Sequence, residues 1–218
     1  MGRTILTPKT INEIKREYIG KIIVFCEGKS EKYYLDYFKN IISKNKFTDI
    51  KIETESANGN AQTVFNFAEN FLSKDENISR YTHYKKYLVF DCDDPYNIQD
   101  VIISMKKSSH DYTLLISNYR FETWLLMHFE NLDNFVTKRY LSEHLSNHLR
   151  HKYKKADVGI IREIISNGSV EIAIKNGYEL ENKYKRLRKN IYSNITEMNP
   201  YTNLHTLIEQ FMLEISSD

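Results

Sequence analysis

Cysteine is nearly absent from this chain, whose 218 residues contain only Cys26 and Cys92. Two cysteines cannot form a disulfide framework, and their spacing does not match the CxxC pattern of a zinc site. We therefore expect both residues to be reduced thiols that are buried in the core.

Long apolar runs are also missing. No stretch approaches the roughly 18 apolar residues that a membrane span needs. The N-terminus lacks the charged-then-apolar pattern of a secretion signal, because Lys, Glu and Arg interrupt residues 5–19. These absences predict a cytoplasmic protein that does not bind a membrane.

The composition does provide material for a core, since 41% of the residues are hydrophobic. The net charge of +2 conceals an uneven distribution, because residues 138–192 hold 13 Lys and Arg against 6 Asp and Glu, a net of +7. A local positive field favours a polyanionic partner such as nucleic acid. A solvated helical surface has a similar composition, so charge alone leaves both interpretations open.

Four segments have the pattern of β-strands, and three of them are continuous apolar runs typical of strands covered on both faces. The segments are 21–26, 49–55, 87–90 and 113–117. Between and after them, apolar residues recur at helical spacing up to about residue 130. This alternation predicts an α/β core over residues 20–130, with a parallel sheet and helices on both of its sides.

After residue 130 the chain reads as helical throughout. We expect residues 131–218 to form a basic helical extension that packs on the sheet, so that the chain is one compact unit. Phe121 and Trp124, in the helix after the last predicted strand, are expected in the core.

Acidic residues follow two of the predicted buried strands. Glu27 ends the first, and Asp91 and Asp93 follow the third. The carboxyl ends of parallel strands meet at one edge of the sheet, so these carboxylates should lie close together. They would repel one another unless protons or a cation neutralise them, and oxygen ligands of this kind suit Mg²⁺ or Mn²⁺. Alternatively, Asp91, Asp93 and Asp94 form only a turn that caps the next helix.

Several segments carry a family resemblance. Residues 25–31, Phe-Cys-Glu-Gly-Lys-Ser-Glu, resemble the opening motif of Toprim domains, and Asp91-Cys-Asp93 completes that motif. Further segments, in the same order along the chain, make it similar to RloB-like abortive-infection proteins. These are residues 117–129, 153–155, 173–174 and 199–205. Tyr119 departs from the family's proline, and Ser30 stands where threonine is more usual.

The resemblance implies a Toprim nuclease of bacterial defence against phage, often beside an AAA-type ATPase partner. By position it implies that Glu27, Asp91 and Asp93 are metal ligands. It makes Glu31 and Asp94 candidates for a second metal or for supporting the first. Lys155 matches the family's Tyr-x-Lys position, close to the chemistry.

Other residues are weaker candidates. Glu122 can reach the acidic edge, or it can simply complement the positive end of its helix. Ser117 could donate a hydrogen bond to phosphate. Basic residues that could contact phosphates, and tyrosines that could stack on unpaired bases, also occur in the extension. They are Lys154, Lys185, Arg186, Arg188, Lys189, Tyr153 and Tyr184.

His144, His148 and His151 share one helix face, but the glutamate of zinc proteases is missing beside the first, so we do not expect a zinc site.

Three functions remain open from the sequence. The first is a divalent-metal-dependent endonuclease. The second is a phosphohydrolase of the haloacid dehalogenase type with Asp91 as nucleophile, which fits less well because that motif normally follows the first strand. The third is a non-catalytic subunit that binds nucleic acid or nucleotide for an ATPase. A homo-oligomer is compatible with each of them.

Overall fold

Three apolar strands form the centre of the β-sheet in this computed structural model. The structure describes residues 19–42, 48–54, 60–93 and 98–216. The central strands are β1 (Lys21–Cys26), β3 (Lys85–Asp91) and β4 (Tyr112–Asn118). They are joined by β2 (Asp49–Thr54) and β5 (Tyr201–Thr202) in the order β2-β1-β3-β4-β5. All neighbouring pairs are parallel except β4 and β5, which are antiparallel.

The central strands are apolar at successive positions because both faces of the sheet are covered. In β1, Ile22 and Val24 point into the core on one face, whereas Ile23 and Phe25 point into the core on the other. Side chains alternate between the faces of a strand, so a continuous apolar run supplies both cores. The two-sided burial predicted from the sequence is therefore observed.

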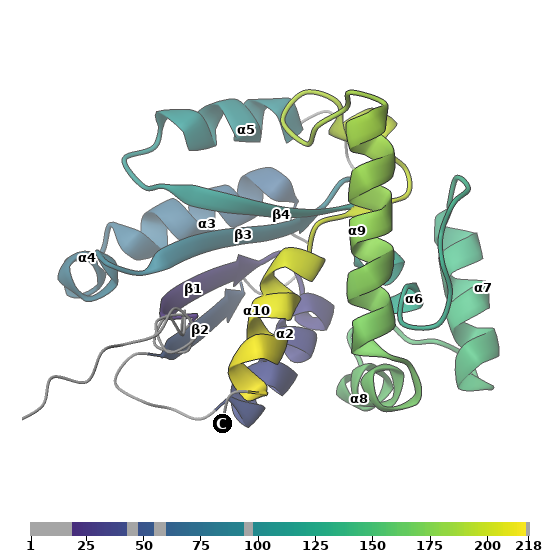
Figure 1. The fold of residues 1–218 in the computed structure, drawn as a ribbon. Coiled ribbons are helices and arrows are strands. Elements are labelled where there is room, and N and C mark those ends of the chain that lie inside the picture. The colour runs from purple at the N-terminus through teal and green to yellow at the C-terminus, as the bar shows by residue number, and fades with distance from the viewer. Residues whose placement is uncertain (1–18, 43–47, 55–59, 94–97, 217–218) are drawn as a thin grey trace, which may run out of the picture.

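Helices cover both faces of the sheet (Figure 1). One face carries α3 (Ala61–Leu72), α4 (Asp75–Tyr81) and α5 (Ile98–Lys107). The core of the other face is built with α2 (Lys29–Ile41), α6 (Phe121–Leu126), α7 (Lys138–Leu149), α8 (Val158–Asn167), α9 (Val170–Arg186) and α10 (His205–Ile215). A single turn of 3₁₀ helix, η1 (Ile195–Glu197), precedes β5.

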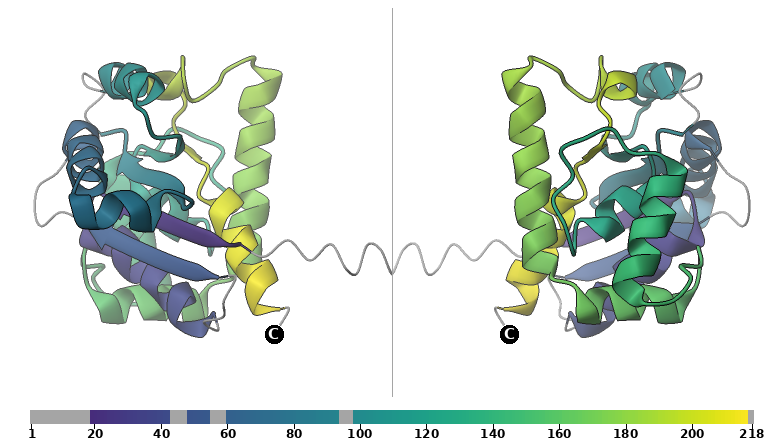
Figure 2. Two further views of the ribbon diagram at one scale, coloured as in Figure 1. Left: turned by 90° about the vertical axis from the view of Figure 1, so that its left-hand side faces the viewer. Right: turned by 90° about the vertical axis from the view of Figure 1, so that its right-hand side faces the viewer.

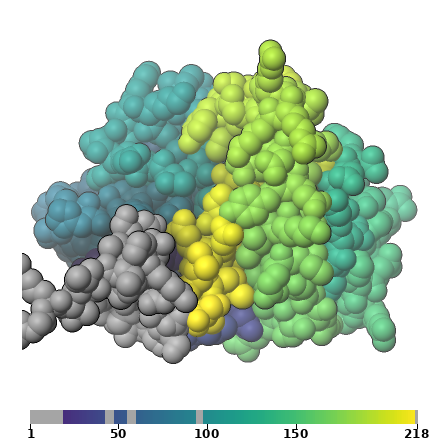
Figure 3. Space-filling model, viewed as in Figure 1, coloured from purple at the N-terminus to yellow at the C-terminus, as the bar shows by residue number. Residues whose placement is uncertain are grey.

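Among the C-terminal helices, α7 and α9 lie beyond the carboxyl edge of the sheet (Figure 1), whereas the end of α10 reaches the start of β1 through Glu214. In Figure 1, the tips of β3 and β4 point toward α6 and α9, and α7 lies beyond them. Figure 2 shows the same arrangement from two sides, and Figure 3 shows α9 and α10 side by side on the surface. The extension therefore packs on the sheet and shares its core, with Leu145, Leu180 and Phe211 in the same buried cluster as Val24. Trp124 is 0% exposed, as expected.

The strand β5 differs from the sequence-based expectation of helices alone after residue 130. It pairs Thr202 with Ser117 and Tyr201 with Asn118. The Asn203 side chain then continues the edge, because its amide accepts from the Ile116 amide and donates to the Leu114 carbonyl, both at 2.8 Å. Two strand residues are too few to produce a readable alternation.

Both cysteines are free and buried, as predicted. In the described part of the chain, no helix is both long enough and apolar enough to cross a membrane.

Candidate functional site: an acidic edge of the sheet

Glu27 and Asp91 are in direct contact at the carboxyl edge of the sheet. The Glu27 amide donates to the Val89 carbonyl at 3.0 Å, which extends the pairing of β1 with β3 by one residue. The Asp91 amide in turn donates to Glu27 Oε2 at 3.0 Å. Asp91 is only 4% exposed. The structure thus brings these two predicted site residues together.

Glu31 joins this cluster from the first turn of α2 and is 1% exposed. The approach depends on Gly28 at the N-cap, since a Cβ there would lie 2.8 Å from Glu31 Oε2. The Glu-Gly dipeptide after β1 therefore supplies one acid and leaves room for a second.

Glu122 and Lys155 reach the same edge from the C-terminal part. Glu122, 5% exposed, lies in the first turn of α6, and its Oε1 accepts a hydrogen bond from the Tyr153 hydroxyl at 3.1 Å. Lys155 Nζ lies 3.8 Å from Asp91 Oδ2. The Lys155 loop is fixed to α2, because the Ala156 amide donates to Ser30 Oγ at 3.0 Å. Ala156 has a φ of 58°, an unfavourable value for alanine that this contact helps to hold.

Asp93 is paired with a cation that the sequence did not suggest for this site. Arg120 Nη2 lies 2.8 Å from Asp93 Oδ2. Arg120 lies in the sequence between the end of β4 and Glu122. A basic residue at the end of a central strand, beside a predicted acidic edge, is the sequence signal that could have identified Arg120 as part of the site. Asp94 lies outside the described residues.

Burial and mutual repulsion raise the pKa values of three carboxyl groups in this cluster. The pKa of Glu27 rises to about 7, mainly through burial, with Glu31 and Asp93 adding to the effect. Burial likewise raises the pKa of Glu31, and it raises that of Asp91 well above the usual range with the help of Glu31, Glu27 and Glu122. For Lys155, partial burial lowers the pKa, but Glu122, Asp91 and Glu31 outweigh it, so the net direction is upward.

Three buried carboxylate oxygens of the cluster have no hydrogen-bond partner among the described residues: Glu31 Oε2, Asp91 Oδ2 and Glu122 Oε2. Such oxygens are suited to accept a cation, and hard divalent ions prefer carboxylate oxygens. The described residues nevertheless contain no group of three or more His, Cys, Asp or Glu side chains already arranged around a metal position. The cluster fits a divalent ion in its donor chemistry, while Asp93 is held by Arg120 instead.

Several weaker candidates have structural partners. The Ser117 hydroxyl contacts that of Thr202 at 3.1 Å and links β4 to β5. Tyr153 and Tyr184 are 8% and 4% exposed, so their rings are unavailable for stacking on bases. Lys185 pairs with Glu181, and Lys189 pairs with Glu197.

His144, His148 and His151 each contact a carboxylate. His144 and His148 contact the two oxygens of Glu130 at 2.9 and 3.1 Å, and His151 contacts Glu163 at 2.9 Å. Each of these three imidazole rings therefore has a carboxylate partner.

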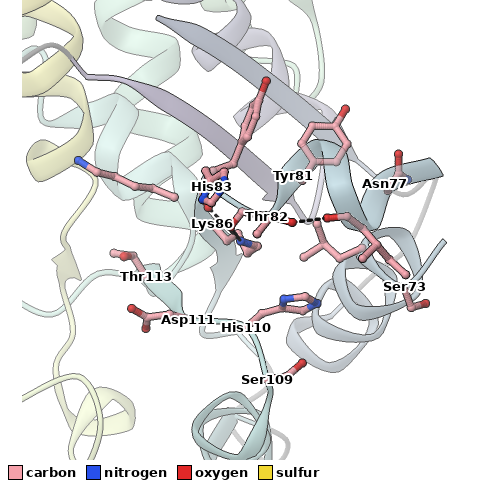
Figure 4. Close-up of a pocket in the computed structure, with 14 residues that line it drawn as sticks. Ser73, Asn77, Tyr81, Thr82, His83, Lys86, Ser109, His110, Asp111 and Thr113 are labelled. Atoms are coloured by element: carbon pink, nitrogen blue, oxygen red, sulfur yellow. Dashed lines mark hydrogen bonds between the residues drawn. The ribbon is translucent and has the colours of Figure 1, made fainter. Parts of the chain in front are cut away.

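A hollow of about 890 Å³ lies at the opposite edge of the sheet (Figure 4). Its lining includes Lys86, whose ammonium donates to the Tyr84 carbonyl at 3.0 Å, and His110. None of the candidate site residues lines it. A smaller hollow of about 200 Å³ adjoins the acidic edge and is lined in part by Arg120, Glu122 and Lys155.

Comparison with known proteins gives one match. No curated protein and no solved structure matched the chain. A family model described as RloB-like protein matches residues 22–211, which include β2 to β5, all of β1 except Lys21, and the described acids of the edge. This chain therefore belongs to the RloB-like family.

Proposed function

We propose that this chain is a divalent-metal-dependent nuclease with a Toprim-type core, which hydrolyses phosphodiester bonds of DNA or RNA. The observation that carries the proposal is the cluster of Glu27, Glu31 and Asp91 at the carboxyl edge of a mostly parallel sheet, with buried oxygens left unpaired. Open sheets of this kind bind ligands at that edge. Buried carboxylates without partners need a cation or protons.

Mg²⁺ or Mn²⁺ would be held by Glu27 and Asp91, with Glu31 beside them. Asp93 would join these ligands once its ion pair with Arg120 opens. When bound, the ion would stabilise negative charge on the phosphate and promote attack by water.

The chain's own residues have separate tasks in this proposal. Lys155, 3.8 Å from Asp91 Oδ2, orients a phosphate by its charge at the rim of the cluster. Glu27, if it is not a ligand, takes the proton of the attacking water. The Tyr153 hydroxyl donates to Glu122 Oε1 and so fixes the orientation of this carboxylate. The other oxygen, Oε2, keeps no hydrogen-bond partner among the described residues.

A cleavage assay tests the proposal. Wild type, Asp91→Asn and Asp111→Asn would be compared on labelled single- and double-stranded DNA and RNA with Mg²⁺, Mn²⁺ or EDTA. Asp111 is the matched control, because it is an exposed acid at the opposite edge of the sheet. We expect metal-dependent cutting that falls at least about 100-fold in Asp91→Asn, since a metal ligand is lost, and that persists in Asp111→Asn.

Binding of Mn²⁺, counted by electron paramagnetic resonance, provides a second readout that does not require a substrate. Asp91→Asn should lose the bound ion and Asp111→Asn should keep it. Equal Mn²⁺ binding by all three proteins would show that the metal site does not lie at the acidic edge.

The family resemblance extends the proposal to defence against phage and to control by an AAA-type ATPase. A nuclease that is always active would damage its host, which favours control by a partner. Cutting by the purified chain with Mg²⁺ at physiological salt that is as fast without the ATPase partner as with it would contradict that control.

One observation favours a second function, a non-catalytic subunit that binds nucleic acid or nucleotide. Arg120 and Lys155 already offset the charges of Asp93 and Asp91 without a metal. If all substrates stay intact, also with the ATPase partner added, and Mn²⁺ does not bind, this second function replaces the first.

A further inference from the structure

The hollow of about 200 Å³ beside the acidic edge is lined mainly by positively charged side chains. Arg120, Lys138 and Lys155 line it, together with the single carboxylate of Glu122. Three cations therefore surround a small open space directly next to a cluster of acids. The Ser142 hydroxyl group belongs to the same lining.

The cations of this hollow retain unused hydrogen-bonding capacity. Arg120 binds Asp93 through Nη2, but its buried Nε has no hydrogen-bond partner in the described part of the chain. Lys138 is exposed at the first position of α7, and no ion pair is found for it among the described residues. Glu122, the one carboxylate of this lining, accepts a hydrogen bond from Tyr153 at its Oε1.

We propose that Arg120, Lys138 and Lys155 form a subsite that binds a backbone phosphate of nucleic acid, next to the phosphate that is cut. The proposal rests on the proposed nuclease function and names how its substrate is held. A guanidinium group presents donors in a planar fork that suits phosphate, and lysine supplies a point charge. The hollow is too small for a whole nucleotide with its base, because ligand pockets of that kind measure about 300 Å³ or more.

The subsite links substrate binding to the acids through Arg120. A phosphate bound in the hollow would compete with Asp93 for the Arg120 guanidinium, whose Nη2 lies 2.8 Å from Asp93 Oδ2, and would thereby make that carboxylate available to a metal. Binding of substrate would then complete the ligand set, which the described residues do not show assembled.

Salt-dependent binding tests the subsite without cleavage. A labelled single-stranded oligonucleotide would be titrated in EDTA by fluorescence anisotropy, over a range of salt concentrations, with wild type and Lys138→Gln. Arg139→Gln is the matched control, because Arg139 is the next residue on α7, carries the same charge and does not line the hollow. Lys138 is exposed, so its replacement should leave the fold intact.

Each phosphate contact contributes about 0.7 to the slope of log K against log salt for single strands. We expect Lys138→Gln to reduce the slope by about 0.7 and to weaken binding several-fold at low salt. Arg139→Gln should match wild type. Arg120→Gln, whose folding is verified by thermal unfolding, should reduce the slope as Lys138→Gln does.

The subsite is refuted if Lys138→Gln and Arg139→Gln have the same slope, or if the oligonucleotide does not bind at all. Binding of adenosine monophosphate as strongly as the oligonucleotide, with the same dependence on Lys138, would overturn the assignment to a backbone phosphate in favour of a free nucleotide. The two proposals can fail separately. If the chain does not cut any substrate but its binding in EDTA still shows the Lys138-dependent slope, the nuclease proposal fails and the subsite stands.

Discussion

Glu31 illustrates at the scale of one residue why the acidic edge is costly to fold. Its side chain is 1% exposed, and one of its oxygens has no hydrogen-bond partner among the described residues. A buried charge without compensation destabilises the native state by several kcal/mol, unless the group takes up a proton or a cation. Glu27 and Asp91 add to the same repulsion. Such an arrangement is typical of sites where function outweighs stability.

Removing one of these charges should stabilise the metal-free protein. We expect Asp91→Asn to raise Tm by a few degrees, since about 1 kcal/mol corresponds to roughly 2–4 °C for a chain of this size. The amide keeps the size of the side chain and abolishes its repulsion with Glu31 and Glu27. Thermal unfolding in EDTA measures the shift. A lower Tm would mean that the pairing with Lys155 outweighs the repulsion.

The pH dependence of stability should report the protonation of Glu27. Its pKa is about 7 in the folded protein, against 4.5 for an unperturbed glutamate. Below about pH 4.5 both states are protonated and the native state is favoured fully. As pH rises toward 7 the unfolded state loses its proton first, so this group's contribution to the free energy of unfolding is lost.

We expect the difference in the free energy of unfolding between Glu27→Gln and wild type to grow with pH. In EDTA, Glu27→Gln should gain stability relative to wild type between pH 5 and 8, since the amide cannot ionise. Urea unfolding at several pH values measures this difference. Glu179→Gln, a change at an exposed position on α9, serves as control and should run parallel to wild type. A constant difference for Glu27→Gln would show that Glu27 has an ordinary pKa.

At the scale of an element, β4 is completed by side chains as well as by backbone. The Asn203 amide forms two hydrogen bonds with β4, and Asn199 makes a similar pair with the backbone of Val136, at 2.9 and 3.0 Å. Asn203 thus takes the place of a strand partner beside β4, whereas Asn199 ties the segment before β5 to the loop before α7. This gives a physical role to two residues of segment 199–205, one of those on which the family resemblance rests.

Loss of the Asn203 side chain should weaken this edge of the sheet. Asn203→Ala leaves the Ile116 amide and the Leu114 carbonyl without protein partners, at a cost of about 1–3 kcal/mol. Urea unfolding measures the change. Asn131→Ala, at an exposed position, is the control and should alter stability by less than about 0.5 kcal/mol. Equal effects of the two substitutions would mean that water replaces the Asn203 contacts.

At the scale of the whole molecule, the sheet and the C-terminal helices share one core. Leu207, Ile208 and Phe211 of α10 are all 0% exposed. Glu214 of the same helix accepts a hydrogen bond from the Ile19 amide at 3.0 Å, next to the start of β1. The last helix is therefore part of the structure that positions the first strand.

Residues 20–130 should consequently fail to fold alone. Without α7 to α10, the core on one face of the sheet, to which Val24 and Val89 belong, would lose all the buried apolar residues that those helices contribute. We expect the fragment to lack a cooperative thermal transition, in contrast to the full chain. Circular dichroism and NMR dispersion provide the measurement. A soluble fragment with a sharp transition would show that the α/β part is an independent domain.

The sequence by itself determined the central sheet. The segments that form β1, β3 and β4 are apolar at successive positions, so both of their faces contribute to the core. Their burial can therefore be predicted from the local sequence alone. The positions of Glu27 and Asp91 followed, because the ends of neighbouring parallel strands must share an edge. Local pattern and sheet topology suffice for such features, since neither depends on which distant segment lies opposite.

Only the tertiary structure decided which charges meet at that edge. Asp93 pairs with Arg120, and Lys155 reaches Asp91 from a loop that is held through Ser30. These contacts join segments far apart in the chain, and a side chain's partner depends on packing that no local pattern encodes. The same holds for β5, whose two residues form a strand because the open edge of β4 lies beside them.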